Sequence, residues 1–450
     1  MGIGHRVLAG LVGLAATLTA FPAAAQEVYF LASGRWDNTI IVIDLQRAID
    51  PANDGTARAV VSRLRVTPDL PAHHSGGAAA PASGQPVSLA VSPDQRTAYV
   101  VNHSGSATHD AARGFQHGHA GSVTVVDLTR ALDPAADGTL AAVVGFIDTL
   151  GAGPVAMAIS PDAHYGVVTN SEGLGNEDGG REVTLIDLAA RRPVRAFLQP
   201  WGNPGHACPP NPIPHASPHP SFGCFTDPTG IAISPRHGGT VFVGNGATDN
   251  VSVISLERLI SGHPEAELGR VPMPTGSFGV TVSPDGALIA VANREATRVD
   301  AEGNTISLID VDRAVREPAQ AEVARILVGT DDPNVRSRPF LAAFTPDGTR
   351  LVVTTFRTNN VSIIDVRKAL AREPALIARI DLATPSGAPS RPRGVAFSPD
   401  GRYAAITGAP RGESNSSVVW MLDLQTNQVV SRVTGIGNES YMIATWVRPR

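Results

Sequence analysis

Histidines that could bind a metal ion are concentrated in a few loop-like segments. Nine of the 13 histidines lie within residues 67–86, 102–122 and 196–228: His73, His74, His103, His109, His117, His119, His206, His215 and His219. Neutral imidazole is a common ligand for zinc and copper. If these segments meet in space, two to four rings would form a site for copper or zinc. No H-E-x-x-H spacing is present, and the competing interpretation is that these are solvated loop histidines.

Arginines form a second set of candidates, mostly in the later half of the chain. They lie at or near the ends of expected strands: Arg35, Arg294, Arg338, Arg357, Arg391, Arg393 and Arg411. Arginine forms paired hydrogen bonds with carboxylate, sulfate or phosphate groups. Gathered around one axis, these side chains would bind a small anionic ligand. The alternative is that they pair with acidic residues of neighbouring segments, such as Glu295 or Asp332.

Motifs for several other chemistries are missing from the sequence. It contains no G-x-S-x-G, no phosphate-binding loop and no G-x-G-x-x-G after a strand, so no nucleotide cofactor is expected. It also lacks C-x-x-C-H, the attachment motif of haem c. The acidic, Gly-rich segment 172–179 could supply oxygen ligands to calcium, but it does not follow the EF-hand spacing.

A repeated phrase indicates how these residues are positioned. A short apolar strand ending in Ser/Thr-Pro, usually with Asp next, occurs six times, at 87–94, 155–162, 229–236, 278–285, 340–347 and 393–400. Pro followed by Asp or Gly favours a tight turn, so each phrase predicts a strand entering a hairpin. The second strand often ends in Asn, as at Asn102 and Asn293, and a third strand of alternating β-branched residues follows. Fixed-period repeats of this kind predict a β-propeller.

The number of blades follows from the third strands. Seven can be counted, near 40–44, 123–127, 183–187, 251–255, 306–310, 361–365 and 418–423. The N-terminal unit has no Ser/Thr-Pro strand, whereas the C-terminal segment Tyr441–Val447 is a strand without a unit. We therefore predict an all-β fold: a seven-bladed β-propeller with four-stranded blades, closed by the C-terminal strand pairing with the N-terminal blade.

Strand order also predicts which loops share a face. Loops between strands two and three, and between one blade and the next, emerge on one side, and these are the long loops. Long loops in a compact fold are usually functional or disordered. All nine histidines and the arginines fall on this predicted face, where Trp36 and Trp201 could also line the mouth of the channel.

The strand-end tetrapeptides Tyr99-Val-Val-Asn102 and Val167-Val-Thr-Asn170 resemble the YVTN family of β-propellers over essentially the whole chain after residue 25. The repeat also resembles the propellers of the 6-phosphogluconolactonase type. That resemblance implies Arg-His pairs on inner strands and a Glu after the Asn. Arg393 and either Glu172 or Glu295 match in part, but no inner-strand His is present.

The N-terminus predicts export. Residues 1–25 combine His5 and Arg6, an apolar run and Ala23–Ala25, as in a cleaved secretory signal peptide, and residues 26–450 form one domain. The expected location is the periplasm or the secreted fraction, where Cys208 and Cys224 would form a disulfide; the alternative is a pair of thiolates that binds a metal ion. Without Arg6 the charge changes from −5 to −6, which argues against nucleic-acid binding, and no later segment could span a membrane.

Three functional hypotheses follow. The first is an exported protein that binds a small anionic molecule or another envelope protein on its long-loop face. The second is a periplasmic metal-dependent oxidoreductase, for which copper is the expected ion, or a subunit of such an enzyme. The third is a lactonase-like hydrolase. The sequence leaves open whether the protein is an enzyme.

Overall fold

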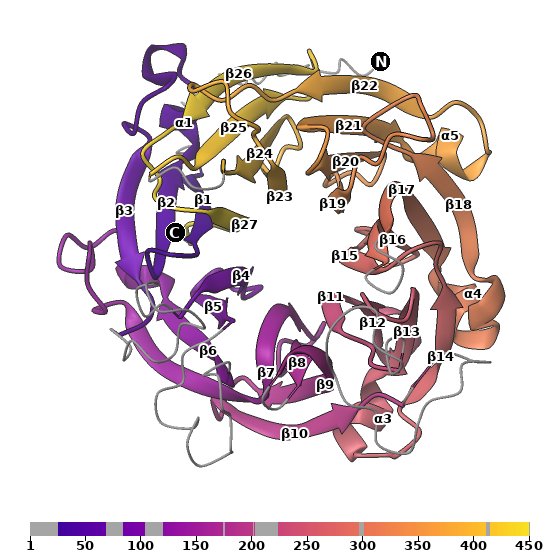
Figure 1. Ribbon diagram of the computed structural model, residues 1–450. Coiled ribbons are helices and arrows are strands. Elements are labelled where there is room, and N and C mark those ends of the chain that lie inside the picture. The colour runs from indigo at the N-terminus through magenta and orange to yellow at the C-terminus, as the bar shows by residue number, and fades with distance from the viewer. Residues whose placement is uncertain are drawn as a thin grey trace, which may run out of the picture.

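The chain forms a ring of β-sheets around a central channel (Figure 1). This computed structural model describes residues 26–68, 84–103, 120–173, 176–200, 202, 224–296, 301–410 and 415–449. The sheets are arranged radially, with the inner strands beside the channel and the outer strands at the circumference. The predicted all-β, seven-bladed propeller is confirmed.

Each blade has four antiparallel strands, which run in chain order from the channel outward except that the inner strand of the first blade comes from the C-terminus. The first blade contains β27 (Ser440–Val447), β1 (Val28–Gly34), β2 (Thr39–Asp44) and β3 (Val60–Arg65). The fourth contains β11 (Pro228–Ser234), β12 (Thr240–Asn245), β13 (Asn250–Ser255) and β14 (Glu267–Pro272). The fifth contains β15 (Ser277–Val282), β16 (Leu288–Ala296), β17 (Ala301–Asp310) and β18 (Glu322–Leu327). The sixth contains β19 (Pro339–Phe344), β20 (Arg350–Thr355), β21 (Asn360–Asp365) and β22 (Leu376–Asp381). The seventh contains β23 (Pro392–Phe397), β24 (Tyr403–Gly408), β25 (Val418–Asp423) and β26 (Gln428–Val433).

Blades two and three share one long strand. They are built from β4 (Pro86–Val91), β5 (Thr97–Asn102), β6 (Ala120–Asp127), β7 (Val143–Ile159), β8 (Tyr165–Gly173), β9 (Asn176–Asp187) and β10 (Arg192–Leu198). The 17 residues of β7 first pair with β6 as the outer strand of blade two and then with β8 as the inner strand of blade three. The two blades are therefore continuous as one seven-stranded sheet.

The C-terminal strand lies in the N-terminal blade. β27 pairs antiparallel with β1, from Val28 opposite Val447 to Gly34 opposite Ser440. The indole of Trp446 stacks on Tyr29 at a centroid distance of 4.9 Å, and its Nε1 donates to the Gln95 carbonyl 2.9 Å away in blade two. Tyr29 and Trp446, which are 417 residues apart in sequence, thus lie in one blade, and Trp446 also contacts the next blade.

The repeated residues have identifiable structural roles. In the first turn the Ser or Thr hydroxyl donates to the Asp carboxylate, as Ser283 Oγ does to Asp285 Oδ1 at 2.6 Å. The same hydroxyl accepts the N–H three residues after the Asp, that of Leu288, at 2.9 Å. The Asn that ends strand two is buried and donates to hydroxyls of strand three, as Asn293 does to Thr305 and Ser307. The Asp that ends strand three caps a short helix, as Asp310 does for α4 (Val311–Arg316).

The remaining helices are short and follow third strands or first turns. They are α1 (Leu45–Ala48), α3 (Leu256–Ser261), α5 (Val366–Leu370) and the 3-10 turns Pro51–Asn53, Leu128–Arg130, Arg236–Gly238 and Pro318–Gln320. In the described part of the chain, no helix has the length and hydropathy to cross a membrane. The predicted signal peptide lies outside the described residues.

Candidate functional site

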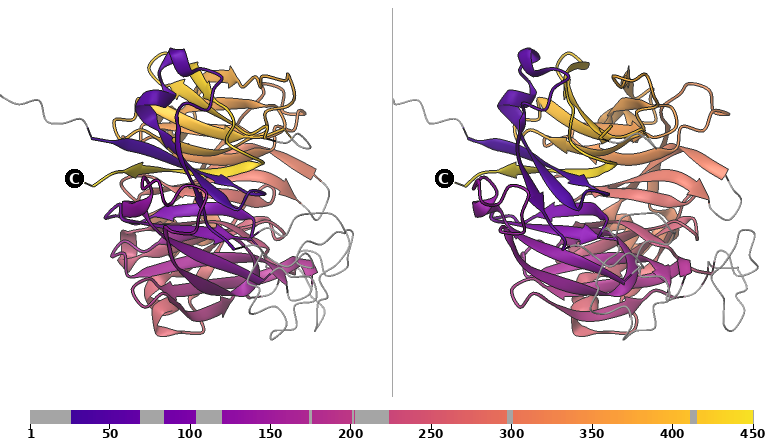
Figure 2. Two further views of the ribbon diagram at one scale, coloured as in Figure 1. Left: turned by 90° about the vertical axis from the view of Figure 1, so that its left-hand side faces the viewer. Right: turned by 60° about the vertical axis from the view of Figure 1, so that its left-hand side comes forward.

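Two residues of each blade are brought together at the face from which the β16–β17 hairpin projects, opposite the C-terminus (Figure 2). In five blades the first residue of the inner strand pairs with the last residue of strand two, as Pro339 does with Thr355 and Ser440 with Gly34. In blades three and five the equivalent pairs, Pro154 with Asn170 and Ser277 with Asn293, lie within longer strands. We call the residue just before each inner strand the bend position. The bend positions are Gln85, Gly153, Asp227, Gly276, Arg338, Arg391 and Glu439.

The bend positions have an unusual backbone. In six of the seven, φ is positive, between 46° and 55°. The residue after strand two donates its N–H to the carbonyl of the bend residue, as His103 does to Gln85 at 3.0 Å and Phe356 to Arg338 at 3.0 Å. The left-handed conformation costs a residue with a side chain roughly 1 kcal/mol. The loops between strands two and three and the loops between blades therefore meet at one mouth of the channel, as predicted. Residues with a strained backbone surround this mouth.

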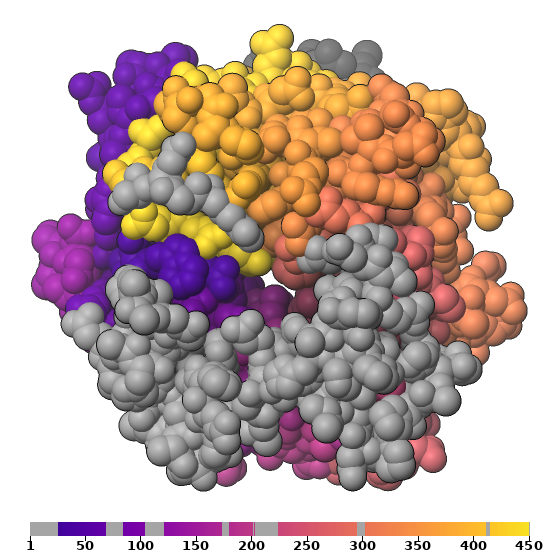
Figure 3. Space-filling view, in the orientation of Figure 1, coloured from indigo at the N-terminus to yellow at the C-terminus, as the bar shows by residue number. Residues whose placement is uncertain are grey.

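Aromatic rings form the floor of this mouth. Phe340 is buried, with ring centroids 4.7 Å from Phe278, 6.3 Å from Phe356 and 5.3 Å from Tyr441. Phe278, Phe340 and Tyr441 are the second residues of the inner strands of blades five, six and one. Figure 3 shows this face, with a hollow near the centre of the ring.

Five of the seven predicted arginines contact this floor. The Arg294 guanidinium lies 4.0 Å from the Phe278 centroid, and Arg338 and Arg391 lie 5.3 and 5.6 Å from that of Phe356. Arg35 is 4.8 Å from Trp36 and 5.5 Å from Tyr441. These side chains come from four consecutive blades: five, six, seven and one. The structure brings these arginines together, and their role in ligand binding stays a prediction.

Arg393 is the fifth and is placed differently from the others. It is the second residue of β23, where blades five, six and one carry an aromatic residue, and it is 1% exposed. Its guanidinium lies 5.4 Å from Phe356 and 5.2 Å from Tyr441. Burial lowers the pKa of Arg393 to about 10, against the opposing effect of Glu439. Arg393 is thus a buried cation beneath the arginines that surround the mouth.

Two carboxylates bridge arginines at the mouth. Glu439 accepts from Arg393 Nη2 at 2.8 Å and lies 3.8 Å from Arg35 Nη1. Glu302 lies 3.4 Å from Arg338 Nη1 and is also hydrogen-bonded to Arg357, which is 57% exposed. Both glutamates were missed by the sequence analysis, which proposed Glu295 and Asp332 as arginine partners. The only sequence signal for Glu439 is its place immediately before an inner strand, at a bend position.

The opposite half of the mouth carries an acid–base pair. His103, just after strand two of blade two, has its Nε2 3.0 Å from Glu172 Oε1 of blade three and its Nδ1 3.2 Å from the Pro154 carbonyl. The exposed fractions of the two side chains are 17% and 8%. A carbonyl only accepts, so Nδ1 carries hydrogen, and a second proton must lie between Nε2 and the carboxyl group. The two side chains are thus placed to share a proton between Nε2 and Oε1.

Gly153 makes room for this pair. A Cβ atom at Gly153 would lie 2.4 Å from Glu172 Cγ, and its φ is +55°. At the bend position of blade three, glycine thus leaves space for the Glu172 side chain. On the other side, Gln85 connects the pair to the arginines: its carbonyl accepts from the His103 N–H, and its side-chain oxygen accepts from Arg35 at 2.8 and 3.1 Å.

The other candidates cannot be placed. His73, His74, His109, His117, His119, His206, His215, His219, Arg411, Cys208 and Trp201 lie outside the described residues, as do the contacts of the Glu295 side chain. Within the described ranges, no three His, Cys, Asp or Glu residues are grouped as metal ligands. The copper or zinc site stays a prediction. Cys224 is buried and is not free, but its disulfide with Cys208 also stays a prediction.

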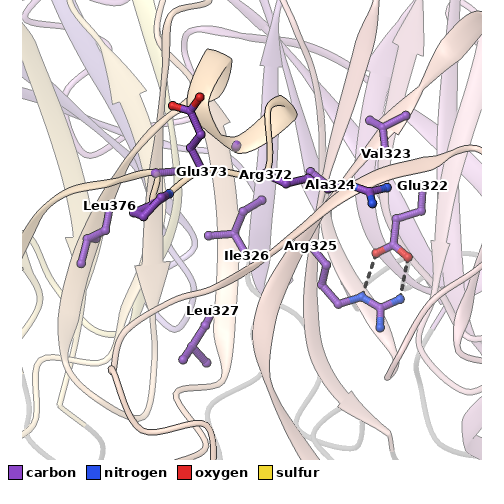
Figure 4. Close-up of a pocket in the computed structure, with 12 residues that line it drawn as sticks. Glu322, Val323, Ala324, Arg325, Ile326, Leu327, Arg372, Glu373 and Leu376 are labelled. Carbon is purple, nitrogen blue, oxygen red and sulfur yellow. Dashed lines mark hydrogen bonds and ion pairs between the residues drawn. The ribbon is translucent and has the colours of Figure 1, made fainter.

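A groove with a volume of about 600 Å³ lies elsewhere, on the circumference between β18 and the α5–β22 connection. Its lining includes Val323, Ile326 and Leu376, together with Arg325, which is paired with Glu322 (Figure 4). None of the predicted site residues lines this groove. The mouth of the channel, where charged groups from several blades converge, is the better candidate site.

Comparison with known proteins supports the fold. The family described as "Lactonase, 7-bladed beta-propeller" matches residues 215–429. No curated protein matches the sequence. The YVTN resemblance proposed from the strand-end tetrapeptides is not confirmed by these comparisons.

Solved structures with the same fold include two lactonase-like proteins. The periplasmic gluconolactonase PpgL of Pseudomonas aeruginosa is 17% identical, with 94% of this chain and 100% of that chain covered and a TM-score of 0.61. A putative 6-phosphogluconolactonase from Bacteroides uniformis is 15% identical, with 94% and 100% covered and a TM-score of 0.59. Hydrazine synthase of Kuenenia stuttgartiensis is 21% identical, with 76% and 77% covered and a TM-score of 0.51. At these identities the likeness concerns the fold.

Proposed function

We propose that this protein is a lactonase-like hydrolase that acts on a small lactone with an anionic group. The observation that carries this proposal is the half-ring of Arg35, Arg294, Arg338 and Arg391 on an aromatic floor. Guanidinium groups from four blades favour a ligand with a carboxylate or phosphate. The match of residues 215–429 to the lactonase family supports ester hydrolysis as the reaction.

The groups needed for that reaction are present at the same mouth. A water oxygen forms a bond to the lactone carbonyl carbon, the ring C–O bond breaks, and the leaving oxygen takes a proton. The His103–Glu172 pair is suited to move that proton, because it holds one between Nε2 and Oε1. The arginines would stabilise the negative charge that develops on the carbonyl oxygen. The product is a hydroxy acid, which releases one proton at neutral pH.

The proton released makes the proposal testable by pH-stat titration. The purified protein is given glucono-1,5-lactone, its 6-phosphate and a carboxylate-bearing lactone, with heat-inactivated protein as the control. We expect hydrolysis above the control rate, with KM at least about tenfold lower for the anionic lactones than for the neutral one, equal to about 1.4 kcal/mol. Failure to accelerate hydrolysis of any lactone would overturn the enzymatic proposal.

The binding part of the proposal is measured separately by calorimetry with the hydroxy-acid products. Binding without hydrolysis would identify an anion-binding propeller, the first of the hypotheses drawn from the sequence. We also propose export through residues 1–25, which N-terminal sequencing of the protein from its native cell would test.

A further inference from the structure

Glu439 occupies the place that a bound anion would take between two arginines. Its Oε1 accepts from Arg393 Nη2 at 2.8 Å, and its Oε2 accepts from the indole Nε1 of Trp36 at 2.5 Å. Oε2 also lies 3.8 Å from Arg35 Nη1. A carboxylate surrounded by two guanidinium groups and an N–H donor reproduces the way in which proteins bind anionic ligands.

Arg393 is incompletely satisfied by this arrangement. It is 1% exposed, and its Nε makes no hydrogen bond to any described residue. Its other hydrogen bond, from Nη1 to the Ser440 carbonyl, is long at 3.4 Å. Burying a guanidinium is costly unless its hydrogen bonds are made. A purely structural arginine would be expected to have a more complete set of acceptors.

The backbone places the Glu439 carboxylate at the boundary between Arg393 and the mouth. Glu439 holds φ at 50°, and its side chain is 14% exposed. The next residue is fixed, because the Ser440 N–H donates to Ser417 Oγ at 2.8 Å. A strained residue that is fixed on one side and partly open to solvent on the other fits a functional position.

We propose that Glu439 is an internal competitor for the anion site. In the free protein its carboxylate neutralises Arg35 and Arg393, and the anionic group of the substrate displaces it to reach them. The inference rests on the proposed function, because it assumes that the mouth binds an anion. It goes further by stating which group binds Arg35 and Arg393 when no ligand is present, and by naming Glu439 as the residue that limits the affinity for an anion.

The test is the Glu439→Gln variant, which keeps the shape and the acceptor oxygen but removes the competing charge. Binding of inorganic phosphate and of gluconate is measured by calorimetry, and folding is checked by circular dichroism and melting temperature. We expect Kd to fall about tenfold for both probes, equal to about 1.4 kcal/mol. Trp36→Phe keeps the charge and removes only the indole donor to Glu439, so it should lower Kd by about two- to threefold, even if Glu439→Gln folds poorly.

Glu27→Gln is the matched control. It removes the same charge from an exposed pair with Arg448, beside the C-terminus and away from the mouth. An equal gain in Glu27→Gln and Glu439→Gln would reduce the effect to general electrostatics and overturn the inference. Weaker binding in Glu439→Gln would also overturn it, because Glu439 would then be positioning Arg393. If neither the wild type nor any variant binds phosphate or gluconate, the anion site itself fails.

Discussion

His103 Nε2 lies 3.0 Å from Glu172 Oε1, although the two residues come from adjacent blades. The lactonase resemblance implies a histidine on an inner strand. His103 is not on an inner strand. The imidazole instead follows strand two of blade two and reaches the carboxylate beside Pro154 of blade three. An interaction between blades thus supplies the pair of groups that the sequence of a single repeat lacks.

Replacing either member of this pair should impair hydrolysis more than binding. For His103→Gln and Glu172→Gln we expect kcat to fall about 100-fold or more, because general acid–base groups contribute typically 10²- to 10⁴-fold. The affinity for inorganic phosphate should stay within about threefold of wild type, since the arginines are retained. Rate against pH checks the role: the variants should lose a limb that the wild type shows. Unchanged kcat in both variants would exclude the pair from the chemistry.

Gly153→Ala should act through Glu172. The added Cβ would lie 2.4 Å from Glu172 Cγ, so the carboxylate must move away from His103. We expect kcat to fall at least about tenfold while the protein remains folded. Gly138→Ala is the matched control: it has a similar φ of +69° but no neighbour within 4 Å of the new Cβ. If both variants lose activity equally, backbone strain rather than the Glu172 position is responsible.

Arg294→Gln should weaken anion binding. The side chain lies over Phe278 at 4.0 Å and 5.1 Å from Phe340, so its charge is held at the centre of the mouth. We expect Kd for inorganic phosphate to rise about tenfold, measured by calorimetry. Arg325→Gln removes a guanidinium from the exposed outer strand β18 and should leave Kd unchanged. An equal rise in Kd for both substitutions would mean that Arg294 affects binding only through the net charge of the protein.

The sequence was sufficient for the fold because its signals are local and repeated. Each Ser/Thr-Pro phrase, such as that ending at Ser283-Pro284, specifies a turn through its own hydrogen bonds, and seven third strands give the blade count. The arginine cluster was also predictable, because strand order fixes the face on which a loop emerges. The predicted strand at Tyr441–Val447 is β27.

The fine structure of the site was not predictable, because it depends on contacts between blades. Glu439 is separated by 46 residues in sequence from Arg393 and by 403 from Trp36. That Arg393 is buried rather than exposed follows from the aromatic residues around it, not from its own repeat. The importance of Gly153 appears only once the Glu172 side chain is placed against it.

Trp446→Ala should destabilise the whole ring. Trp446 is 1% exposed, stacks on Tyr29 and donates to the Gln95 carbonyl of blade two. Loss of such a side chain costs about 3–5 kcal/mol, which urea unfolding would measure. Leu376→Ala, on an outer strand and 42% exposed, should change stability by less than about 0.5 kcal/mol. Equal and small effects would mean that the pairing of β27 with β1 contributes little to stability.

The repeated turns predict a specific dependence of stability on acid. The Ser283 hydroxyl donates to Asp285 and lowers the pKa of that carboxyl group below its usual value. A lowered pKa in the folded state stabilises the protein above the unfolded pKa, near 3.8, and this contribution is lost as the pH falls through the folded value.

Ser283→Ala should therefore lower the free energy of unfolding by about 1 kcal/mol at pH 7. Urea unfolding at pH 7 and at a series of lower pH values should show the difference from wild type shrinking as Asp285 becomes protonated. Ser261→Ala, whose hydroxyl donates to the Arg258 carbonyl, should give a difference that does not change with pH. A constant difference for Ser283→Ala as well would show that the hydroxyl acts through its bond from the Leu288 N–H and not through the carboxylate.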